Sequence, residues 1–317
     1  MPKILITGAG GLIGSRLQTM LLDRGCYINT IGRTAGRPVK DKVKSFVWDI
    51  NSQNMDTRAL DRVDAIIHLA GAGVADKRWT DARKKEIMDS RIDSTRLLFN
   101  TLKKTTHQVK TIISASAVGY YGDCGDEIVT EQHPVADTFL ADVTRRWEDE
   151  VSLFEGLGIR HVCCRIGIVL SKNGGALPEL VKTLPLGVAG YFSKSPLYYP
   201  WIHIDDVCGI MIHAIENSKL RGSYNTTAPG PVLIRDLMKS IVTAKNSKAV
   251  LTPVPPFAIR LALGEMAEML LSSQRCSNEK ILKTGYQFYF PTLKKALENI
   301  YGPQTPQGGL NANQKAV

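Results

Sequence analysis

Hydrophobic and polar residues alternate between short apolar runs and longer stretches in which an apolar residue returns every three or four positions. The first run, residues 4–7, enters a glycine cluster, and the stretch after it carries Leu17, Met20 and Leu21 on one side before Gly25. A short apolar run predicts a buried strand, and a spacing of three or four predicts a helix that ends at the glycine. This beginning is typical of an α/β fold.

The same alternation continues along the chain, but glycines and prolines become frequent after residue 170. Further strands are predicted at residues 27–31, 46–49, 64–73, 109–116, 159–170 and 224–230. Helices are predicted at residues 78–95, 142–153, 205–216, 256–271 and 292–300, the third with Asp205 or Asp206 as its N-cap. Glycines and prolines between residues 171 and 200 predict an irregular excursion away from the sheet.

The turn between the first strand and the first helix has the chemistry of an anion site. Gly8, Gly11 and Gly14 are spaced three apart, with Gly10 between them. Backbone N–H groups at a helix N-terminus point outward, and the helix dipole favours negative charge. In such a turn the glycines permit the tight bend, the approach of a pyrophosphate and the close packing of helix on strand. An ordinary turn with incidental glycines is the alternative.

The end of the second predicted strand favours NADP over NAD. In dinucleotide-binding folds this position reaches the adenosine ribose, where NAD enzymes place an acidic residue. Here the position holds Gly32, followed by Arg33. Because a guanidinium binds phosphate in a fork geometry, this exchange suits a ribose that carries a 2′-phosphate. The alternative is that Arg33 is an ordinary loop charge.

Hydroxyl groups follow one of the later strands. The run at residues 109–116 includes Ser114 and Ser116, and Tyr120 and Tyr121 follow in a loop bounded by glycines. Open α/β sheets bind ligands beyond the carboxyl ends of their strands, so polar groups of a substrate would be met here. Packing or loop rigidity is the alternative role for the tyrosines.

Two other polar residues lie inside otherwise apolar strands. His68 is interpreted as a packed core histidine rather than a catalytic base. Arg165 needs an anionic partner if it is buried, because an unpaired buried charge is strongly unfavourable.

The charge, the hydrophobicity and the cysteine content of the chain argue against several classes of function. The net charge is +10, but the basic residues are scattered and no recognition helix, zinc finger or RNA-binding motif accompanies them, so nucleic-acid binding is not expected. No apolar run has the length of a membrane span and no signal segment is visible, so we expect a cytoplasmic protein without membrane association. The six cysteines form no Cys-x-x-Cys pair and predict buried thiols rather than a metal site.

Several motifs resemble the extended short-chain dehydrogenase/reductase superfamily, and more closely its atypical branch of epimerase family proteins with a characteristic C-terminal domain. The most specific are the Arg-Trp-Thr at residues 78–80 with the Ser-Arg-Ile at residues 90–92, and the Ser-Ala-Val-Gly-Tyr-Tyr-Gly at residues 116–122. The matching stretches are residues 7–14, 64–71, 78–95, 113–122, 139–148, 165–170, 200–206 and 264–297.

The resemblance implies a Rossmann-type, doubly wound parallel sheet of about seven strands, a smaller and mostly helical C-terminal cap, and bound NADP(H). A homodimer through exposed helices of the core is ordinary in this superfamily. The cofactor contacts that the resemblance implies are Gly8, Gly11, Leu12, Ile13, Gly14, Arg33, Leu69, Ala70, Gly71, Glu86, Arg91 and Arg165. The expected division is an NADP-binding domain at residues 1–170 and 201–228, a cap at residues 171–200 and 229–301, and a disordered tail at residues 302–317.

The chain departs from the superfamily at its catalytic pair. The superfamily uses Tyr-x-x-x-Lys on the helix before the long strand, and alignment on Glu148 places Leu140 and Thr144 at those positions. The chemistry needs a tyrosine hydroxyl of lowered pKa and a lysine ammonium group that lowers this pKa. Leucine and threonine provide neither group. Any activity must therefore use other groups.

Two functions remain open from the sequence. The first is an NADP-dependent oxidoreductase or epimerase acting on a small carbonyl compound or sugar nucleotide. Ser114 or Ser116 would bind the carbonyl oxygen, and Tyr121 or Tyr120 would donate the proton. The missing positive charge would come from Lys84, Lys85 or His203. The second is an NADP(H)-binding regulator or scaffold without turnover, since some relatives are connected with cell or plastid division.

Overall fold

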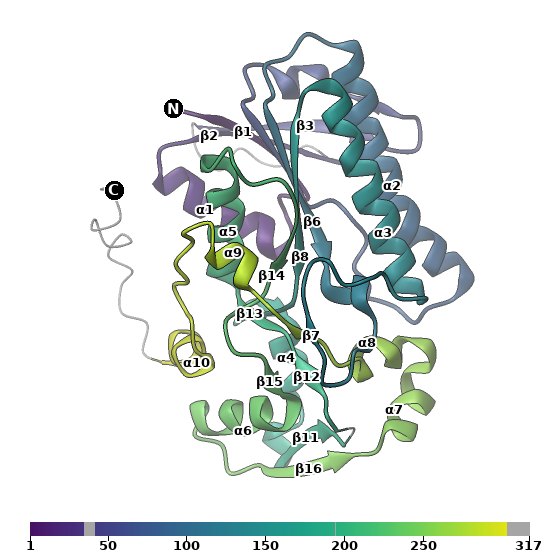
Figure 1. Ribbon diagram of the computed structural model, residues 1–317, viewed down its shortest axis with the longest axis vertical. Helices are drawn as coiled ribbons and strands as arrows, with labels where there is room; N and C mark the ends of the chain where they lie inside the picture. The colour runs from purple at the N-terminus through teal and green to yellow at the C-terminus, as the bar shows by residue number, and fades with distance from the viewer. Residues whose placement is uncertain (35–41, 194, 303–317) are drawn as a thin grey trace.

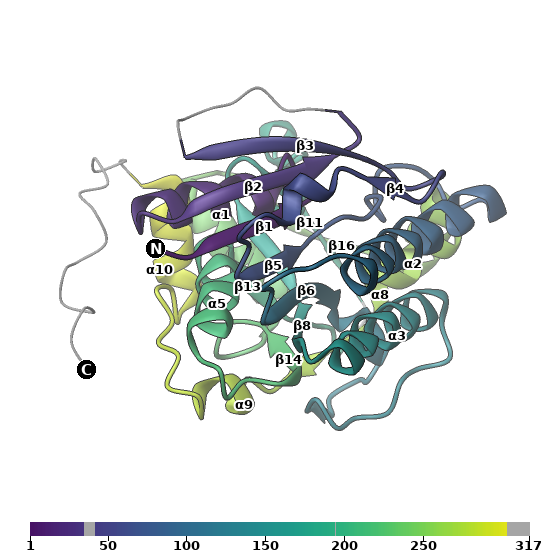
Figure 2. The same cartoon turned by 90° about the horizontal axis from the view of Figure 1, so that it is seen from above.

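Eight strands form the central sheet of this computed structural model, which describes residues 1–34, 42–193 and 195–302 (Figures 1 and 2). Seven of the strands run parallel, and a two-residue strand pairs antiparallel at one edge. The predicted parallel sheet of about seven strands is confirmed. In sheet order the strands are β14 (Gly222–Thr226), β8 (Arg160–Ile166), β6 (Thr111–Ala117), β5 (Ala65–His68), β1 (Lys3–Thr7), β2 (Tyr27–Gly32), β3 (Val43–Asp49) and β4 (Asn54–Met55).

Helices cover both faces of this sheet (Figure 2). On one face α1 (Leu12–Asp23) and α5 (Ile204–Glu216) pack against the apolar side chains of β1, β6 and β8. On the other face α2 (Asp81–Lys104) and α3 (Phe139–Ser152) bury a second apolar cluster. The strand order reverses between β1 and β5, and open α/β sheets bind ligands at such a point, beyond the carboxyl ends of the strands.

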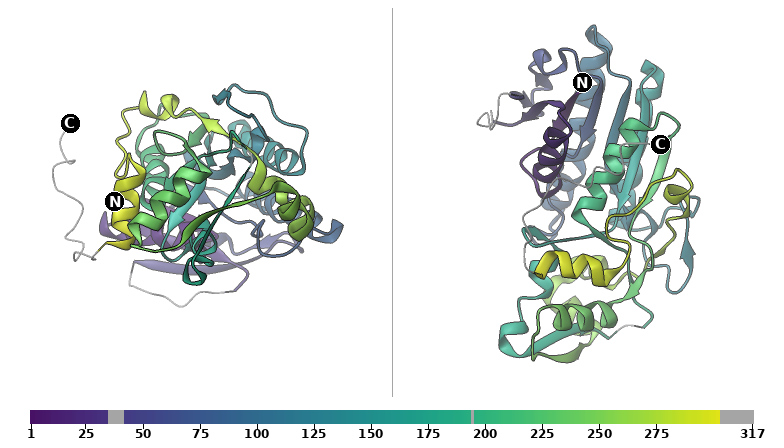
Figure 3. Two further views of the ribbon diagram at one scale, coloured as in Figure 1. Left: turned by 90° about the horizontal axis from the view of Figure 1, so that it is seen from below. Right: turned by 90° about the vertical axis from the view of Figure 1, so that its left-hand side faces the viewer.

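A smaller unit lies beyond the carboxyl ends of the strands (Figures 1 and 3). Its apolar core brings Trp201 together with side chains of α6 and α10. Its strands are β9 (Ile168–Ser171), β10 (Gly174–Gly175), β11 (Val188–Phe192), β12 (Tyr198–Tyr199), β13 (Trp201–His203), β15 (Val232–Leu233) and β16 (Val250–Val254). Its helices are α4 (Ala176–Leu180), α6 (Ile234–Ala244), α7 (Pro256–Leu263), α8 (Ala267–Leu271) and α10 (Leu293–Tyr301).

Two further segments return to the large sheet's side of the molecule. The short strand β17 (Arg275–Cys276) pairs parallel with β7 (Ile128–Val129). The helix α9 (Glu279–Leu282) follows and buries Ile281 against α5. The C-terminal segment is therefore anchored to the part of the fold that contains the large sheet as well as to the cap.

Residues 159–170, predicted as one strand, form two strands in different sheets. The break lies at Gly167, whose backbone N–H donates to the carbonyl oxygen of Thr226. A Cβ at this glycine would overlap the carbonyl oxygen of Pro200. The chain therefore turns here, because the next residue, Ile168, pairs with Trp201 rather than with the large sheet.

Two helix boundaries also differ from the prediction. The N-cap of α5 is His203 and the helix begins at Ile204, so a cap at Asp205 or Asp206 is wrong. The helix predicted at residues 256–271 is interrupted at Gly264, whose φ of +60° lies in the left-handed region that a helix cannot contain.

None of the described helices combines the length and the apolar character that crossing a membrane requires. The predicted disordered tail lies, apart from its first residue, outside the described residues.

Candidate functional site

The turn after β1 is shaped by glycines with different requirements. Gly8 has a φ of +64°, and a Cβ there would lie 2.7 Å from the carbonyl oxygen of Leu69. A Cβ on Gly14 would overlap the carbonyl oxygen of Gly8, so only glycine lets α1 approach the turn this closely. A Cβ on Gly10 would meet nothing within 4 Å. The turn is therefore closed toward the sheet and open on its outer side.

The open side of this turn is the N-terminal end of α1. The helix begins at Leu12, and its N-cap, Gly11, has no side chain to satisfy the first N–H groups. These groups lack acceptors within any α-helix, and the helix dipole favours an anion beside them. Gln18 and Ser15 donate to the carbonyl oxygen of Ala9, at 2.9 and 3.4 Å, and hold the turn from the inside. The geometry fits a pyrophosphate.

A buried histidine ties the turn after β5 to β1. His68 Nδ1 lies 2.8 Å from Thr7 Oγ1, and its Nε2 lies 3.1 Å from Thr95 Oγ1. Thr7 Oγ1 also accepts the backbone N–H groups of Leu69 and Ala70, at 3.0 and 3.1 Å. The prediction of a packed core histidine is confirmed. Through Thr7, this histidine positions two of the predicted cofactor contacts.

The buried His68 should make the free energy of unfolding fall in acid. Burial lowers its pKa to about 3 from 6.5, so the unfolded chain binds a proton between these values and the folded chain does not. Stability from this group is present above pH 6.5 and is lost as the pH falls toward 3. We expect about 2 kcal/mol of loss between pH 7 and pH 5. Urea unfolding at both pH values measures it, and His68→Gln should reduce the difference by that amount. An unchanged difference in the variant would contradict this assignment.

Arg91 lies at the exit of β5 without a carboxylate partner among the described residues. Its Nη1 donates to the carbonyl oxygens of Ala72 and Ile87, at 3.0 and 2.8 Å, and its guanidinium lies 5.2 Å from the centre of the Trp147 ring. Burial lowers its pKa to about 10, and it remains a cation at neutral pH. A cation held beside Gly71 fits an anionic or carbonyl group of a ligand at this edge.

The second turn of α2 carries a further charged group, Glu86. Glu86 accepts from Arg83 Nη1 at 2.6 Å. Its pKa is lowered, first by that hydrogen bond and to a smaller extent by the charges of Lys77 and Arg33. The structure therefore brings Arg33, at the end of β2, within electrostatic reach of Glu86 on α2. Both are predicted cofactor contacts, and both side chains are exposed.

Arg165 has the anionic partner that burial requires. Its Nε and Nη2 donate to the two carboxylate oxygens of Glu148 on α3, at 2.8 and 2.7 Å. Burial alone would lower the pKa of Arg165, but the hydrogen bonds and charge of Glu148 raise it above its usual value. Its Nη1 donates to Tyr121 Oη and to the carbonyl oxygen of Glu131, at 2.9 and 3.2 Å. All three nitrogens are thus engaged inside the protein, and a cofactor contact stays a prediction.

The two serines of β6 donate their protons within the protein. Ser116 Oγ donates to Glu148 Oε1 at 2.5 Å, and the buried Ser114 donates to the carbonyl oxygen of Ala115 at 2.9 Å. A serine hydroxyl has one proton, and a substrate carbonyl oxygen would need it. In this geometry each serine can accept a hydrogen bond but does not offer one. Carbonyl binding by either serine stays a prediction that this arrangement does not favour.

The paired tyrosines differ in their surroundings. Tyr121 is buried, and its hydroxyl donates to Asn225 Oδ1 at 2.6 Å while accepting from Arg165. Burial raises the pKa of Tyr121 well above its usual value, against the opposing effect of Arg165. Tyr120 is partly exposed, with its ring centre 3.6 Å from the Arg165 guanidinium carbon. Proton donation by either tyrosine stays a prediction, and the geometry gives Tyr121 no free proton for it.

The positions that align with the superfamily's catalytic pair lie on the first turns of α3. Thr144 Oγ1 donates to the carbonyl oxygen of Leu140 at 2.6 Å, within the helix. The Leu140 side chain faces Gly119, where an added Cβ would lie 3.4 Å from it. Neither side chain holds a proton for a substrate.

The three candidates for the missing positive charge have separate environments. Lys84 forms an ion pair with Glu265 of the cap, and Lys85 pairs with Asp89 one turn along α2, at 2.5 Å. His203 caps the start of α5 by accepting a backbone N–H at 3.1 Å, and burial lowers its pKa to about 4. Of these, Lys84 alone lies beside the N-terminal end of α3, with its ammonium 5.5 Å from the centre of the Phe139 ring.

Two polar residues organise the surroundings without having been assigned these roles from the sequence. Asp206 accepts the backbone N–H groups of Tyr289 and Phe290, at 2.7 and 3.0 Å, and fastens the C-terminal segment to α5. Burial raises its pKa to about 6. Asn225 receives the Tyr121 hydroxyl. No local signal in the sequence indicated either role, because β14 is itself rich in polar residues.

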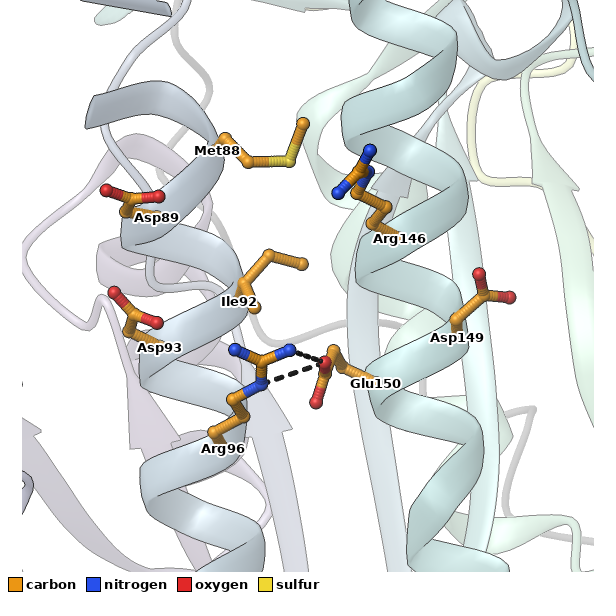
Figure 4. Close-up of a pocket in the computed structure, with 8 residues that line it drawn as sticks. All are labelled: Met88, Asp89, Ile92, Asp93, Arg96, Arg146, Asp149 and Glu150. Atoms are coloured by element: carbon orange, nitrogen blue, oxygen red, sulfur yellow. Dashed lines mark hydrogen bonds and ion pairs between the residues drawn. The ribbon is translucent and has the colours of Figure 1, made fainter. Parts of the chain in front are cut away.

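A hollow of about 280 Å³ lies between the outer faces of α2 and α3 (Figure 4). Arg96 reaches across it and donates to Glu150 Oε1 at 2.6 and 2.9 Å. Charged side chains form most of its wall, and a homodimer through these helices stays a prediction. The lining residues are Met88, Asp89, Ile92, Asp93, Arg96, Arg146, Asp149 and Glu150.

The described residues contain no group of three or more His, Cys, Asp or Glu side chains placed to hold a metal ion. All six cysteines are free, and Cys124 alone among them is partly exposed.

Comparison with known proteins finds two family matches and several relatives of full length. The NAD-dependent epimerase/dehydratase family matches residues 4–148, and a domain of unknown function, DUF1731, matches residues 254–300. An epimerase family protein of Staphylococcus saprophyticus is 35% identical over 95% of this chain and 99% of its own length. The mouse epimerase family protein SDR39U1 is 30% identical over 94% of this chain and 99% of its own length.

Solved structures show the same relationship. Human epimerase family protein SDR39U1 with NADPH superposes with a TM-score of 0.84, at 29% identity, over 94% of this chain and 99% of that one. UDP-glucuronic acid 4-epimerase from Bacillus cereus with NAD has a TM-score of 0.75 at 19% identity, over 94% of this chain and 97% of that one, and shares the fold.

Proposed function

Because this chain belongs to the epimerase family of extended short-chain dehydrogenase/reductase-like proteins, we propose that it binds NADP(H) and exchanges a hydride with a small carbonyl compound or sugar nucleotide. The open glycine turn at the N-terminal end of α1 carries the proposal. Human SDR39U1, which was crystallised with NADPH, supports the choice of a phosphorylated dinucleotide.

The residues at the carboxyl edge fit this group. The N–H groups at the start of α1 would hold the pyrophosphate, and Arg33 would hold the 2′-phosphate. Leu69 and Ala70, held by Thr7, would line the adenosine side, and Arg91 would face a polar group of the cofactor. When bound, NADP(H) would supply or accept the hydride, and the chain would orient the nicotinamide and exclude water from it.

Arg33 should determine the preference for NADPH over NADH. Loss of a charge-assisted contact with the 2′-phosphate costs about 1.5–3 kcal/mol, or roughly 10- to 150-fold in affinity. Arg33→Ala should therefore weaken NADPH binding by such a factor and leave NADH binding nearly unchanged, as measured by isothermal titration calorimetry. Lys110→Ala, which removes an exposed charge just before β6, at the opposite ends of the strands, is the matched control. Equal weakening of both cofactors in Arg33→Ala would refute the 2′-phosphate assignment.

One observation favours a second function. Ser116, Tyr121 and Thr144 all donate their hydroxyl protons to protein acceptors, at 2.5–2.6 Å. A protein that binds NADP(H) without a proton donor beside the nicotinamide would act as a regulator or scaffold rather than an enzyme. The absorbance of NADPH, followed with a panel of carbonyl compounds and sugar nucleotides, distinguishes the two. Steady oxidation supports the enzyme, and tight NADPH binding without oxidation supports the regulator.

A further inference from the structure

The cap carries the most exposed apolar side chains of the described residues. Apart from the N-terminal methionine, the four large apolar side chains with the highest exposure are Leu186, Val250, Phe257 and Leu261, which are 80%, 69%, 71% and 83% exposed. None of the four packs in an apolar cluster of the described residues. Single exposed apolar residues are ordinary, but large ones that gather in one part of a molecule are typical of a contact surface.

One part of this surface is the open face of the two-stranded sheet of β11 and β16. Val188 lies opposite Val250 in the parallel register, and Leu186 precedes Val188 by two residues. Successive side chains of a strand point to opposite faces, and the neighbouring Ala189 and Leu251 pack with α6 in the cap core. The face that carries Val188 and Val250 is therefore the outer one.

The helix α7 continues this surface, because β16 leads directly into it at the lower end of the molecule in Figure 1. Phe257 and Leu261 are four residues apart and share one side of α7, with Arg260 next to them. No side chain of α7 is fully buried, and Leu263 alone among them packs with an apolar cluster. A helix side with exposed apolar residues and a cation is typical of helices that lie at the surface of a membrane.

The charges around these side chains favour an anionic partner. Residues 181–193 and 245–263 carry the exposed apolar side chains and contain four basic residues but no acidic one. Lys182 pairs with Glu179, whereas Lys248 and Arg260 form no ion pair among the described residues. Two cations without a counter-charge therefore border the exposed apolar side chains.

The same features disfavour a second copy of this chain as the partner. A two-fold contact sets the same surface of both copies against itself, so the unpaired Lys248 and Arg260 would meet their own equivalents. Pairing of another strand along the edge of β16 is disfavoured too, because Pro253 has no N–H group to donate. A lipid surface with acidic headgroups meets neither obstacle.

We propose that this part of the cap docks on the surface of an anionic membrane. The cap patch, as we call it, consists of Leu186, Val188, Val250, Phe257 and Leu261, bordered by Lys248 and Arg260. The apolar side chains enter the headgroup region, and the basic ones meet the phosphate and carboxylate groups of acidic lipids. Such docking needs neither a spanning helix nor a signal segment, the two features on which the expectation of no membrane association rested. It is independent of the proposed function, since the patch includes none of the predicted cofactor contacts.

Sedimentation of the full chain with lipid vesicles tests the proposal. One kind of vesicle contains equal parts of phosphatidylcholine and phosphatidylserine, and the other contains phosphatidylcholine alone. We expect the chain to bind the first kind at low salt and to be released as the salt concentration rises. Binding to the second kind should be at least about 10-fold weaker, because each basic residue at an anionic surface contributes about fivefold to affinity.

Matched pairs of variants test the two parts of the patch. Phe257→Ser with Leu261→Ser should weaken binding about 100-fold or more, since burial of each side chain contributes about 10-fold or more. Ile128→Ser with Leu153→Ser, which alters two exposed apolar side chains outside the cap, should bind like the unchanged chain.

For the charges, Lys248→Glu with Arg260→Glu should remove most of the preference for phosphatidylserine. Lys103→Glu with Lys104→Glu, the same change of charge at the end of α2, should retain it. Thermal melts establish that each variant is folded.

Several results would overturn the proposal. These are equal binding to the two kinds of vesicle, no binding to either, or a folded variant with serine at positions 257 and 261 that binds like the unchanged chain. Analytical ultracentrifugation of the full chain without vesicles provides a further test. A dimer that the same serine variant dissociates would assign the patch to a second copy and would also overturn the proposal.

Discussion

Replacing Glu148 with alanine is expected to lower the free energy of unfolding by about 3–5 kcal/mol, the range for breaking a buried ion pair from one side. Glu148 accepts two hydrogen bonds from Arg165 and one each from Ser116 and Ser223, and only 5% of the Arg165 side chain is exposed. Without the carboxylate, the guanidinium would stay buried beside Tyr121 without a counter-charge. Chemical denaturation of the variant and of the unchanged chain measures the difference.

Glu150 on the same helix provides the matched control. It pairs with Arg96 at the surface, where the Arg96 and Glu150 side chains are 55% and 15% exposed, and surface pairs contribute about 0–1 kcal/mol (Figure 4). Glu150→Ala should therefore change stability by no more than that. Similar losses of stability in Glu148→Ala and Glu150→Ala would contradict a special contribution of the buried Glu148–Arg165 pair.

Gly14→Ala should abolish high-affinity binding of NADPH. The added Cβ would overlap the carbonyl oxygen of Gly8, so the start of α1 must move away from the turn. The N–H groups that would meet the pyrophosphate move with it. Losing two charge-assisted hydrogen bonds, each worth about 1.5–3 kcal/mol, reduces affinity by about 100-fold or more. Calorimetry gives the affinity, and circular dichroism with a thermal melt establishes that the variant is folded.

Gly10→Ala is the control for this turn, because a Cβ there meets nothing within 4 Å. It should leave folding unchanged and affect NADPH affinity far less than the change at Gly14. A folded Gly14→Ala protein that binds NADPH like the unchanged chain would exclude the turn as the pyrophosphate site.

Much of the fold could be predicted because its signals are local. Apolar runs bounded by glycines and polar residues predict the strands of the parallel sheet, and Gly8, Gly11 and Gly14 identify the turn without any knowledge of distant partners. The break at Gly167 could not be predicted, because the carbonyl that requires a glycine belongs to Pro200, which comes close only in the folded chain.

The interior of the site could be predicted less well, because its polar residues are defined by distant partners. The Tyr121 hydroxyl donates to Asn225, which is 104 residues away in the sequence, and Asp206 receives N–H groups from residues more than 80 positions later. The sequence indicated that Arg165 needs an acidic partner, but it did not indicate that Glu148 would also take the proton of Ser116. Each of these pairings depends on how the strands and the C-terminal segment meet.

Calorimetric titration of the unchanged full chain with NADPH and, separately, with NADH tests the central claim most directly. The glycine turn with Arg33 at the end of β2 predicts one site per chain, with NADPH bound at least about 10-fold more tightly than NADH. If neither dinucleotide binds, the assignment of this chain as an NADP(H)-binding protein is contradicted, and equal affinity for the two would contradict its preference for NADPH.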